Sequence, residues 1–519
     1  MEAADAIVIG AGHNGLVAAN LLADAGWQVL VLESAAAPGG AVHTEEVTAP
    51  GFRNDLCSAF FPMAALSPAI AALDLGSYGL RWAHAPVALG HLAPDNRFFA
   101  LHRDLDRTLA GLGADASAWR RLVEQWQSLR DPLLAALFSP FPPVRAGMRL
   151  AGKAGVAELI RLARTMVLPA RQLVEENFSG DGARLLIAGC ALHTDVGIDS
   201  AGSGLFGWLL AMAAQDVGFP VPVGGAGELT AALVRRLLAR GGEVRCGQHV
   251  RQILIGRGRA VGVRDGSGAP IRARSAVLAD VPAPTLYRDL VGSDHLPSRL
   301  VDDLRRFSWD SGTVKVDWAL SGPIPWTNAE AAAAGTVHLG VDLDGMTAYS
   351  ADLARRRVPE TPFVLLGQMT TADPTRSPAG TETAWAYTHV PNQGDPAAVA
   401  QRIEQLIESH APGFRDLVIG RHVQGPAELE GRNPGLIGGA INGGTAAIHQ
   451  QLFFRPIPGL GRADTPIDRL FLAGSAAHPG GAVHGGPGAN AARAALRRDG
   501  LFGDAYAGIV GSALRAIYA

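Results

Sequence analysis

Three glycines near the amino terminus have the spacing needed to bind a phosphate-rich ligand. Gly10, Gly12 and Gly15 form a G-x-G-x-x-G motif. Their missing side chains permit a tight turn, a close approach of backbone to a pyrophosphate, and tight packing of a helix on a strand. The helix expected over Leu16–Ala25 offers free N–H groups and the positive end of its dipole to phosphates. By itself this motif is weak evidence for a dinucleotide site, so the assignment depends on the elements around it.

Those surrounding elements follow the order of a dinucleotide-binding βαβ unit. A short β-branched run, Ala6–Ile9, precedes the glycines, and a second strand over Gln28–Leu32 ends at Glu33. A carboxylate at that place accepts hydrogen bonds from both ribose hydroxyls and repels a 2′-phosphate. We therefore predict an adenine dinucleotide in this segment and do not expect NADP.

A second glycine turn favours FAD over NAD. Gly39 and Gly40 follow Glu33 closely, as in FAD enzymes of the glutathione-reductase-like class, where such a turn passes near the pyrophosphate. Many of those enzymes have arginine directly after the two glycines, where this chain has Ala41. Backbone or another residue must then take over any contact that this arginine makes. The alternative is that the two glycines form an ordinary loop.

Composition limits the remaining classes of function. The 519 residues are too many for one simple core, and 48% hydrophobic with 18% charged residues suits a well-packed globular enzyme. The net charge of -3 gives no reason to expect a nucleic-acid partner. Cys57, Cys190 and Cys246 are far apart and form no Cys-x-x-Cys, so we expect neither a dithiol centre nor a metal site. Such sparse cysteines, with no leader pattern before the first strand, favour a cytoplasmic protein.

Taken together, the N-terminal motifs resemble the phytoene desaturase-like family of FAD oxidoreductases. The resemblance rests on the three motif glycines, on 39–46 (Gly-Gly-Ala-Val-His-Thr-Glu-Glu) and on Pro50-Gly51-Phe52. Within that family the chain is most similar to the branch called pyridine nucleotide-disulfide oxidoreductase domain-containing protein 2. That branch name implies a disulfide centre, which this chain lacks.

Two later blocks extend the resemblance. Val223–Leu229 opens a helix followed by alternating strands, and the resemblance implies that Val250 meets the adenine through its backbone. Near the carboxyl terminus, a buried strand from Leu470 leads through a glycine-rich loop into a helix over Ala491–Leu496. The dipole of a helix starting near Gly488 would stabilise the negative charge that a reduced flavin carries.

The resemblance implies an α/β fold with a Rossmann-like FAD-binding domain of the glutathione-reductase-like class. This domain would comprise 1–70, 220–300 and 455–519, and an α+β substrate domain would be inserted as two pieces, 71–219 and 301–454. The predicted cofactor-binding residues are Gly10, Gly12, Asn14, Gly15, Glu33, Ser34, Gly39, Gly40, Ala41, Val42, Val250, Gly474, Ser475, Gly481, Val483 and Gly488.

The reaction that we expect is dehydrogenation of a small apolar organic substrate by hydride transfer to flavin N5. Because no second strand-plus-G-x-G-x-x-G unit appears, the electrons would leave to an external acceptor such as oxygen or a quinone. Two alternatives stay open. One is a redox-neutral isomerase or double-bond saturase, and the other is a non-catalytic flavin-binding partner protein.

Two histidines are the candidates for proton transfer. His478 and His484 flank the glycines of the C-terminal loop, and imidazoles exchange protons near neutral pH. The alternative is that both donate hydrogen bonds to loop backbone. His193 with Asp195 is a weaker candidate pair.

The segment 145–171 suggests two interpretations. Its part Val156–Val167 carries apolar residues at helical spacing, and arginines and one lysine surround them. Related desaturases take polyenes from membranes, so this is either a peripheral membrane contact or an ordinary helix with a solvated basic face. The longest apolar run, Leu205–Ala214, is too short to span a bilayer.

Overall fold

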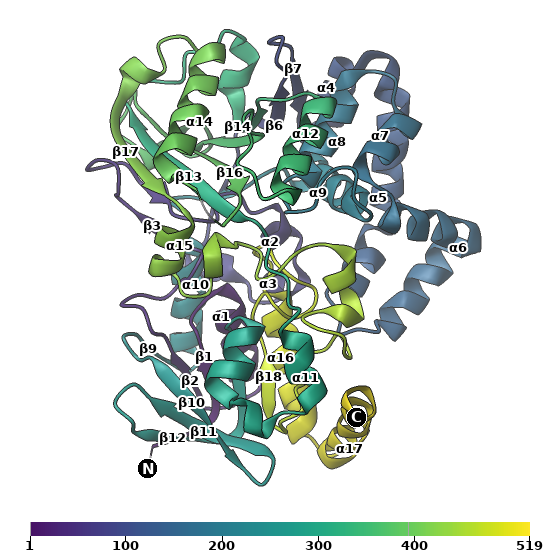
Figure 1. Ribbon diagram of the computed structural model, residues 1–519, viewed down its shortest axis with the longest axis vertical. Coiled ribbons are helices and arrows are strands. Elements are labelled where there is room, and N and C mark those ends of the chain that lie inside the picture. Colours follow the sequence, from purple (N-terminus) through teal and green to yellow (C-terminus); the bar gives the residue numbers. More distant parts are fainter. Residues whose placement is uncertain (1, 393) are drawn as a thin grey trace.

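Two sheets, each with its own helices, form the two units of the molecule (Figure 1). The computed structural model describes residues 2–392 and 394–519. Both chain ends lie in the lower unit of Figure 1, while the strands of the upper unit come from the middle of the chain. This is the predicted α/β architecture with a discontinuous dinucleotide-binding unit. The exact domain boundaries stay a prediction.

The sheet of the first unit is built around parallel strands. In the order β10-β11-β12-β1-β2-β9, β12, β1, β2 and β9 run parallel, and β18 adds parallel to β12. Its strands are β1 (Ala3–Ile9), β2 (Val29–Leu32), β9 (Glu243–Arg245), β10 (Val250–Gly256), β11 (Arg259–Asp265), β12 (Pro270–Ala279) and β18 (Leu470–Leu472). The apolar residues of β1 and β2 are almost all buried, as expected of a parallel sheet covered on both faces.

Because parallel strands end at the same edge of a sheet, the residues that follow them meet there. Gly10 follows β1, Glu33 follows β2, Asp280 follows β12, and Gly474 comes shortly after β18. The backbone N–H of Asp280 donates to the carbonyl of Ile9 at 2.8 Å, which extends the β1–β12 pairing beyond the strands. One edge of the sheet therefore collects the predicted glycines and the acidic residue.

Helices cover both faces of this sheet. On one face lie α1 (His13–Asp24), α10 (Gly227–Ala239) and α16 (Gly486–Asp499), which share a buried core with β1 and β2. On the other lie α11 (Ser298–Leu304) and α17 (Gly503–Tyr518). The predicted helices over 16–25 and 491–496 both begin earlier than expected, because glycines 12 and 485 open them.

The sheet of the second unit is mixed, in the order β17-β13-β16-β15-β14-β6-β7. Its strands are β6 (Val87–Leu92), β7 (Phe98–Leu101), β13 (Gly312–Leu320), β14 (Ala334–Leu339), β15 (Val364–Gln368), β16 (Glu382–Val390) and β17 (Val418–Gln424). Only β6 and β14 pair in parallel, and the others are antiparallel. Helix α14 (Pro396–His410) packs against one face, and α8 (Asp181–Ala191) and α9 (Ser203–Val217) pack against the other.

The helices of the upper right in Figure 1 extend from that second face. They are α4 (Leu105–Leu112), α5 (Ala116–Leu137), α6 (Val144–Val167) and α7 (Ala170–Asn177), and α12 (Leu343–Ala354) packs on α8. Helix α6 is longer than predicted and projects from the body, and it is broken at Gly155, whose φ is 75°.

Shorter elements connect the units. They are β3 (Thr44–Glu45), β4 (Asn54–Asp55), α2 (Pro62–Leu66), α3 (Pro68–Ala71), β5 (Trp82–Ala83), β8 (Val221–Pro222), α13 (Met369–Ala372) and α15 (Pro426–Arg432). The pairs β3–β4 and β5–β8 form two small antiparallel ribbons.

Close packing of α16 on α1 depends on one glycine. A Cβ at Gly488 would lie 1.9 Å from the backbone oxygen of Asn14, so the Gly488→Ala substitution must push the two helices apart. We expect it to lower the free energy of unfolding by about 3 kcal/mol, as overpacking against backbone does. Urea denaturation followed by circular dichroism measures this effect.

The matched control is Gly508→Ala in α17, where nothing lies within 4 Å of the added methyl group. A glycine replaced by alanine in an exposed helix should stabilise the protein by about 0.5–1 kcal/mol. Equal effects of the two substitutions would contradict the packing described for α1 and α16.

Candidate functional site

A cavity of about 610 Å³ connects the two units. On the side of the first unit it is lined from three stretches that are remote in sequence: 9–14 with 32–37, then 248–250, then 475–483. Residues 280–290 complete this wall. The carboxyl edge of the parallel sheet therefore faces the cavity, as the order of strands and glycines predicts.

The glycine turns form the part of the cavity next to α1. Gly12 precedes the helix without a side-chain cap, which leaves backbone N–H groups of the first turn available to an anion. The second glycine turn lies against the first, because the N–H of Gly39 donates to the carbonyl of Ala11 at 2.9 Å. Gly39 and Gly40 have φ values of 130° and 57°, which favour glycine at these two positions.

Glu33 lies at the end of β2 with its carboxylate held in place. One oxygen accepts the N–H of Ala11 at 2.7 Å, and the other accepts the N–H of Ala35 at 2.8 Å. The residue is 8% exposed and lines the cavity. Its position at the second strand end is the one that the sequence predicts for a ribose-binding carboxylate.

Asp280 is a second carboxylate at this edge that the sequence analysis missed. Its Oδ2 accepts the N–H of Gly15 at 2.8 Å, at the amino end of α1. Burial, together with the nearby charge of Glu33, raises the pKa of Asp280 to about 7. The signal was present in the sequence: like Glu33, Asp280 directly follows a buried parallel strand.

The C-terminal loop reaches the same cavity from the opposite end of the chain. Ser475 and Val483 line it, and the amide of Asn14 donates to the hydroxyl of Ser475 at 3.3 Å. Ten of the predicted cofactor-binding residues line the cavity: Gly10, Gly12, Asn14, Glu33, Ser34, Gly40, Ala41, Val250, Ser475 and Val483.

The six others lie behind this wall and shape it. Gly15, Gly39 and Gly488 lie close to backbone atoms, and Val42 is fully buried in the core. Gly474 packs against Asp280 and Val281, and Gly481 packs against Asn442. Cofactor contact by all sixteen residues stays a prediction.

The residues present fit an adenine dinucleotide. A Cβ at Gly12 would lie 2.6 Å from Asp280 Oδ2, so a side chain there would fill the space beside the helix end. Within the described part of the chain, Asn14 Oδ1 and His13 Nε2 are buried without a hydrogen-bond partner. Free amide donors, a ribose-type carboxylate and unsatisfied polar atoms at one helix terminus are the groups that a bound pyrophosphate and ribose require.

His478 and His484, the candidates for proton transfer, point into the protein and do not line the cavity. Nε2 of His478 lies 3.1 Å from the carbonyl of Ser139. Nδ1 of His484 accepts the N–H of Gly486, so its Nε2 donates to the carbonyl of Gly481 at 2.8 Å. Burial lowers the pKa of His478 to about 4 and that of His484 to about 3. These contacts match the alternative of hydrogen bonds to loop backbone, and a catalytic role stays a prediction.

The second unit contributes an apolar and aromatic wall to the cavity. Phe60, Phe219, Trp385, Leu210 and Leu365 line it. Apolar residues at such a wall exclude water and give no counter-charge to an ionic ligand. This half of the cavity suits an apolar molecule.

Cys57 also lines the cavity. Burial raises the pKa of Cys57 to about 11, so the thiol stays protonated at neutral pH. All three cysteines are free, and among the described residues no three His, Cys, Asp or Glu side chains are grouped to bind a metal ion.

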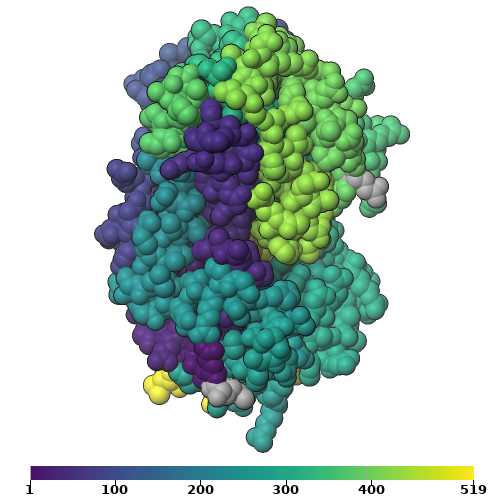
Figure 2. Space-filling view, turned by 90° about the vertical axis from the view of Figure 1, so that its left-hand side faces the viewer, coloured from purple at the N-terminus to yellow at the C-terminus, as the bar shows by residue number. Residues whose placement is uncertain are grey.

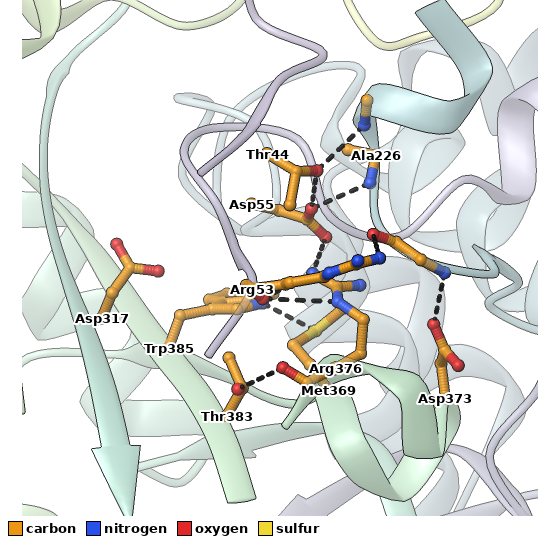
Figure 3. A network of polar contacts seen from close by, with 12 residues as sticks. Thr44, Arg53, Asp55, Ala226, Asp317, Met369, Asp373, Arg376, Thr383 and Trp385 are labelled. Carbon is orange, nitrogen blue, oxygen red and sulfur yellow. Dashed lines mark hydrogen bonds and ion pairs between the residues drawn. The ribbon is translucent and has the colours of Figure 1, made fainter. Parts of the chain in front are cut away.

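A buried polar network ties the loops of the first unit to the second sheet (Figure 3). Arg376 and Asp55 form an ion pair at 2.7 Å, and both side chains are fully buried. The carboxylate of Asp55 also accepts the hydroxyl of Thr44 at 2.7 Å and the N–H of Ala226 at 2.8 Å. Separating the two partners would leave an uncompensated buried charge, which is costly, so they stay in contact. The network therefore holds the two walls of the cavity in position relative to each other.

A second link lies at the surface. Arg432 at the end of α15 forms an ion pair with Glu45 of β3 at 2.9 Å, and both line the cavity. Figure 2 shows purple N-terminal residues directly beside yellow-green residues from the C-terminal part of the second unit. Exposed pairs of this kind contribute little stability, but they position the loops at the cavity border.

The raised pKa of Asp280 makes a pH-dependent prediction. An aspartate whose pKa rises on folding from 3.8 to about 7 contributes full stability below pH 4, and that stability is lost as the pH rises to about 7. Asp280→Asn keeps an oxygen that can accept the N–H of Gly15. The asparagine side chain does not ionise, so the variant does not lose this stability as the pH rises. At pH 8 the FAD-free variant should therefore be more stable than the unchanged protein by roughly 4 kcal/mol.

Urea denaturation at pH 5 and pH 8 measures this difference, which should be less than half as large at the lower pH. The exposed Asp294→Asn change is the control and should leave the pH dependence of stability unchanged. Parallel stability curves for Asp280→Asn and the unchanged protein would refute the raised pKa of Asp280.

Comparison with known proteins identifies the family of the chain. Residues 15–377 match the family described as flavin containing amine oxidoreductase. The chain is 27% identical to pyridine nucleotide-disulfide oxidoreductase domain-containing protein 2 of Rattus norvegicus, over 95% of this chain and 93% of that protein. It is 26% identical to one of the subunits of limonene dehydrogenase from Castellaniella defragrans, over 96% and 95% of the two chains.

Among solved structures, cyclohexylamine oxidase from Brevibacterium oxydans superposes with a TM-score of 0.58 at 18% identity, covering 95% of this chain and 99% of that one. Identity at this level establishes the fold alone. The predicted resemblance and the predicted FAD cofactor are both confirmed by the family match. Since that match spans most of the chain and the cavity has the groups that the cofactor needs, the protein belongs to the flavin containing amine oxidoreductase family and is an FAD-dependent oxidoreductase.

Proposed function

We propose that this enzyme dehydrogenates a small apolar organic substrate. The observation that carries the proposal is the continuity of one cavity, which joins the dinucleotide cradle of the first unit to the aromatic wall of the second. Bound FAD would supply the redox chemistry by taking a hydride at N5 while the second hydrogen leaves the substrate as a proton to solvent, and an external acceptor, oxygen or a quinone, would take the two electrons onward with protons.

The residues of the chain bind, orient and exclude water. Glu33 and the glycine turns would hold the cofactor, while Phe60, Phe219 and Trp385 would hold the apolar substrate. The name of one relative, limonene dehydrogenase, refers to a hydrocarbon and supports an apolar substrate here.

Anaerobic turnover tests this proposal with limonene as the first hydrocarbon probe. Dehydrogenation should bleach the flavin absorption at about 450 nm, and oxygen or a quinone should restore it. A flavin that stays oxidised with every hydrocarbon tried contradicts the proposal. Product formed without bleaching and without an acceptor would instead support the redox-neutral isomerase, whereas a saturase would form product only with flavin reduced beforehand.

Cofactor affinity tests the part played by Glu33. Glu33→Ala removes the carboxylate that would bind the ribose hydroxyls, and charge-assisted hydrogen bonds contribute about 1.5–3 kcal/mol. We expect the dissociation constant of FAD for the FAD-free protein to rise at least about tenfold, as measured by calorimetric titration.

Glu243→Gln is the matched control, because Glu243 is exposed at the start of the neighbouring β9. It should leave FAD affinity unchanged. If Glu33→Ala bound FAD as tightly as this control, the ribose would have to be held elsewhere.

We further propose that α6 within 145–171 touches membranes peripherally. Met148, Val156 and Ile160 are 63%, 76% and 66% exposed, and Arg145, Arg149, Lys153 and Arg161 lie on the same helix. In Figure 1 part of α6 projects away from the body, while Leu150 and Leu162 pack into the core beside α5 and α9. No helix in the described part of the chain is long and apolar enough to cross a bilayer. Exposed apolar residues beside arginines suit contact with an anionic lipid surface.

Sedimentation with phosphatidylglycerol-containing vesicles measures this contact. Val156→Ser with Ile160→Ser should lower vesicle binding about tenfold, because two apolar side chains no longer enter the lipid. The control pair Leu501→Ser with Phe502→Ser changes exposed apolar residues elsewhere and should have no effect. Equal losses for both pairs, or no binding of the unchanged protein, would reject α6 as the contact.

A further inference from the structure

Two polar rings, those of His193 and Tyr387, stand in the largely apolar wall of the cavity. His193 lines the cavity, and its ring packs edge-on against Phe219 with 6.1 Å between the ring centroids. Sequence analysis paired His193 with Asp195, but the carboxylate of Asp195 accepts the hydroxyl of Thr445 and the N–H of Ala446 instead. The function described so far gives His193 no role.

His193 is held by a second imidazole. Its Nε2 lies 2.8 Å from Nε2 of His338 on β14, so the two nitrogens share one proton. His338 is fully buried, and within the described part of the chain its Nδ1 has no hydrogen-bond partner. That nitrogen faces Gly189 of α8, where a Cβ would come within 2.3 Å of it.

This packing determines which nitrogen carries each proton. A buried N–H without an acceptor is rarer and less favourable than a buried lone pair without a donor. His338 therefore keeps its Nδ1 bare and donates from Nε2 to His193. The proton of His193 is then on Nδ1, which has no hydrogen-bond partner among the described residues and belongs to a ring that lines the cavity.

Both imidazoles are uncharged. Burial lowers the pKa of His193 to about 3 and holds the pKa of His338 well below its usual value. Nearby His91 donates from Nε2 to the carbonyl of Val341 at 3.0 Å, so it does not compete for the shared proton. His193 thus offers the cavity a single neutral N–H donor.

We propose that His193, positioned by His338, recognises an uncharged acceptor oxygen, a carbonyl or hydroxyl, on an otherwise apolar substrate. This inference rests on the proposed function and narrows its substrate class. A carboxylate bound to His193 would lose its hydration beside Phe219 and the uncharged His338, so a neutral oxygen fits this position better. A pure hydrocarbon would leave the N–H of His193 unsatisfied.

Carvone and limonene are suitable probes, because they share a carbon skeleton and carvone adds one carbonyl. Their dissociation constants for the FAD-loaded protein are measured by calorimetric titration. One hydrogen bond to a buried donor should make carvone bind about tenfold more tightly than limonene. The ratio of the two constants is the readout, and it does not depend on turnover.

His193→Phe keeps an aromatic ring and removes the donor, so the ratio should fall to about one. Gly189→Ala acts from outside the cavity: its methyl group displaces His338, and the ratio should fall partway. The matched control is His410→Phe, since His410 is a buried imidazole on α14 that does not line the cavity. It should leave the ratio unchanged.

Equal affinity of the unchanged protein for the two probes, or a preference that survives His193→Phe, would overturn the inference. Failure of the proposed function has a different signature, namely a colourless protein or a flavin that no substrate reduces. A protein that binds FAD and is reduced by hydrocarbons, but shows no preference for carvone, would refute the inference alone.

Discussion

The structure depends on the convergence of parallel strands at one edge of a sheet. Strands from the start, the middle and the end of the chain lie side by side, and each delivers its following residue to the same place. The glycines can approach a pyrophosphate there only because the strands fix their backbone. A shift of one strand would move Glu33, Asp280 or the C-terminal loop away from the cavity. The cofactor site would then lack one of the stretches of chain that line it.

Much of this convergence could be predicted from the sequence. Gly10, Gly12 and Glu33 have positions set by local elements, a strand, a turn and a helix, whose order is visible in the chain. The C-terminal loop was predicted from the family resemblance, which matches its buried strand and the glycines that follow it. Helix boundaries were less accurate, because Gly12 and Gly485 begin helices that the apolar pattern alone places later.

The remaining features depend on contacts between distant segments, which no local pattern reveals. Asp55 and Arg376 look like ordinary surface residues in sequence, yet they form a fully buried ion pair between the two units. His478 and His484 make their hydrogen bonds to backbone carbonyls that the sequence does not place near them, and their role in proton transfer stays a prediction. His193 acquires a defined proton only through His338, which the second sheet brings beside it. Each of these features is a property of packing.

Hydrogen–deuterium exchange of the chain with and without FAD tests the central claim most directly. If three separated stretches jointly hold the cofactor, FAD should slow amide exchange in residues 10–15, 248–250 and 474–488 at the same time. Exchange in α14 should change little. Protection confined to the N-terminal stretch would contradict the account, because the middle and C-terminal segments would then take no part in binding.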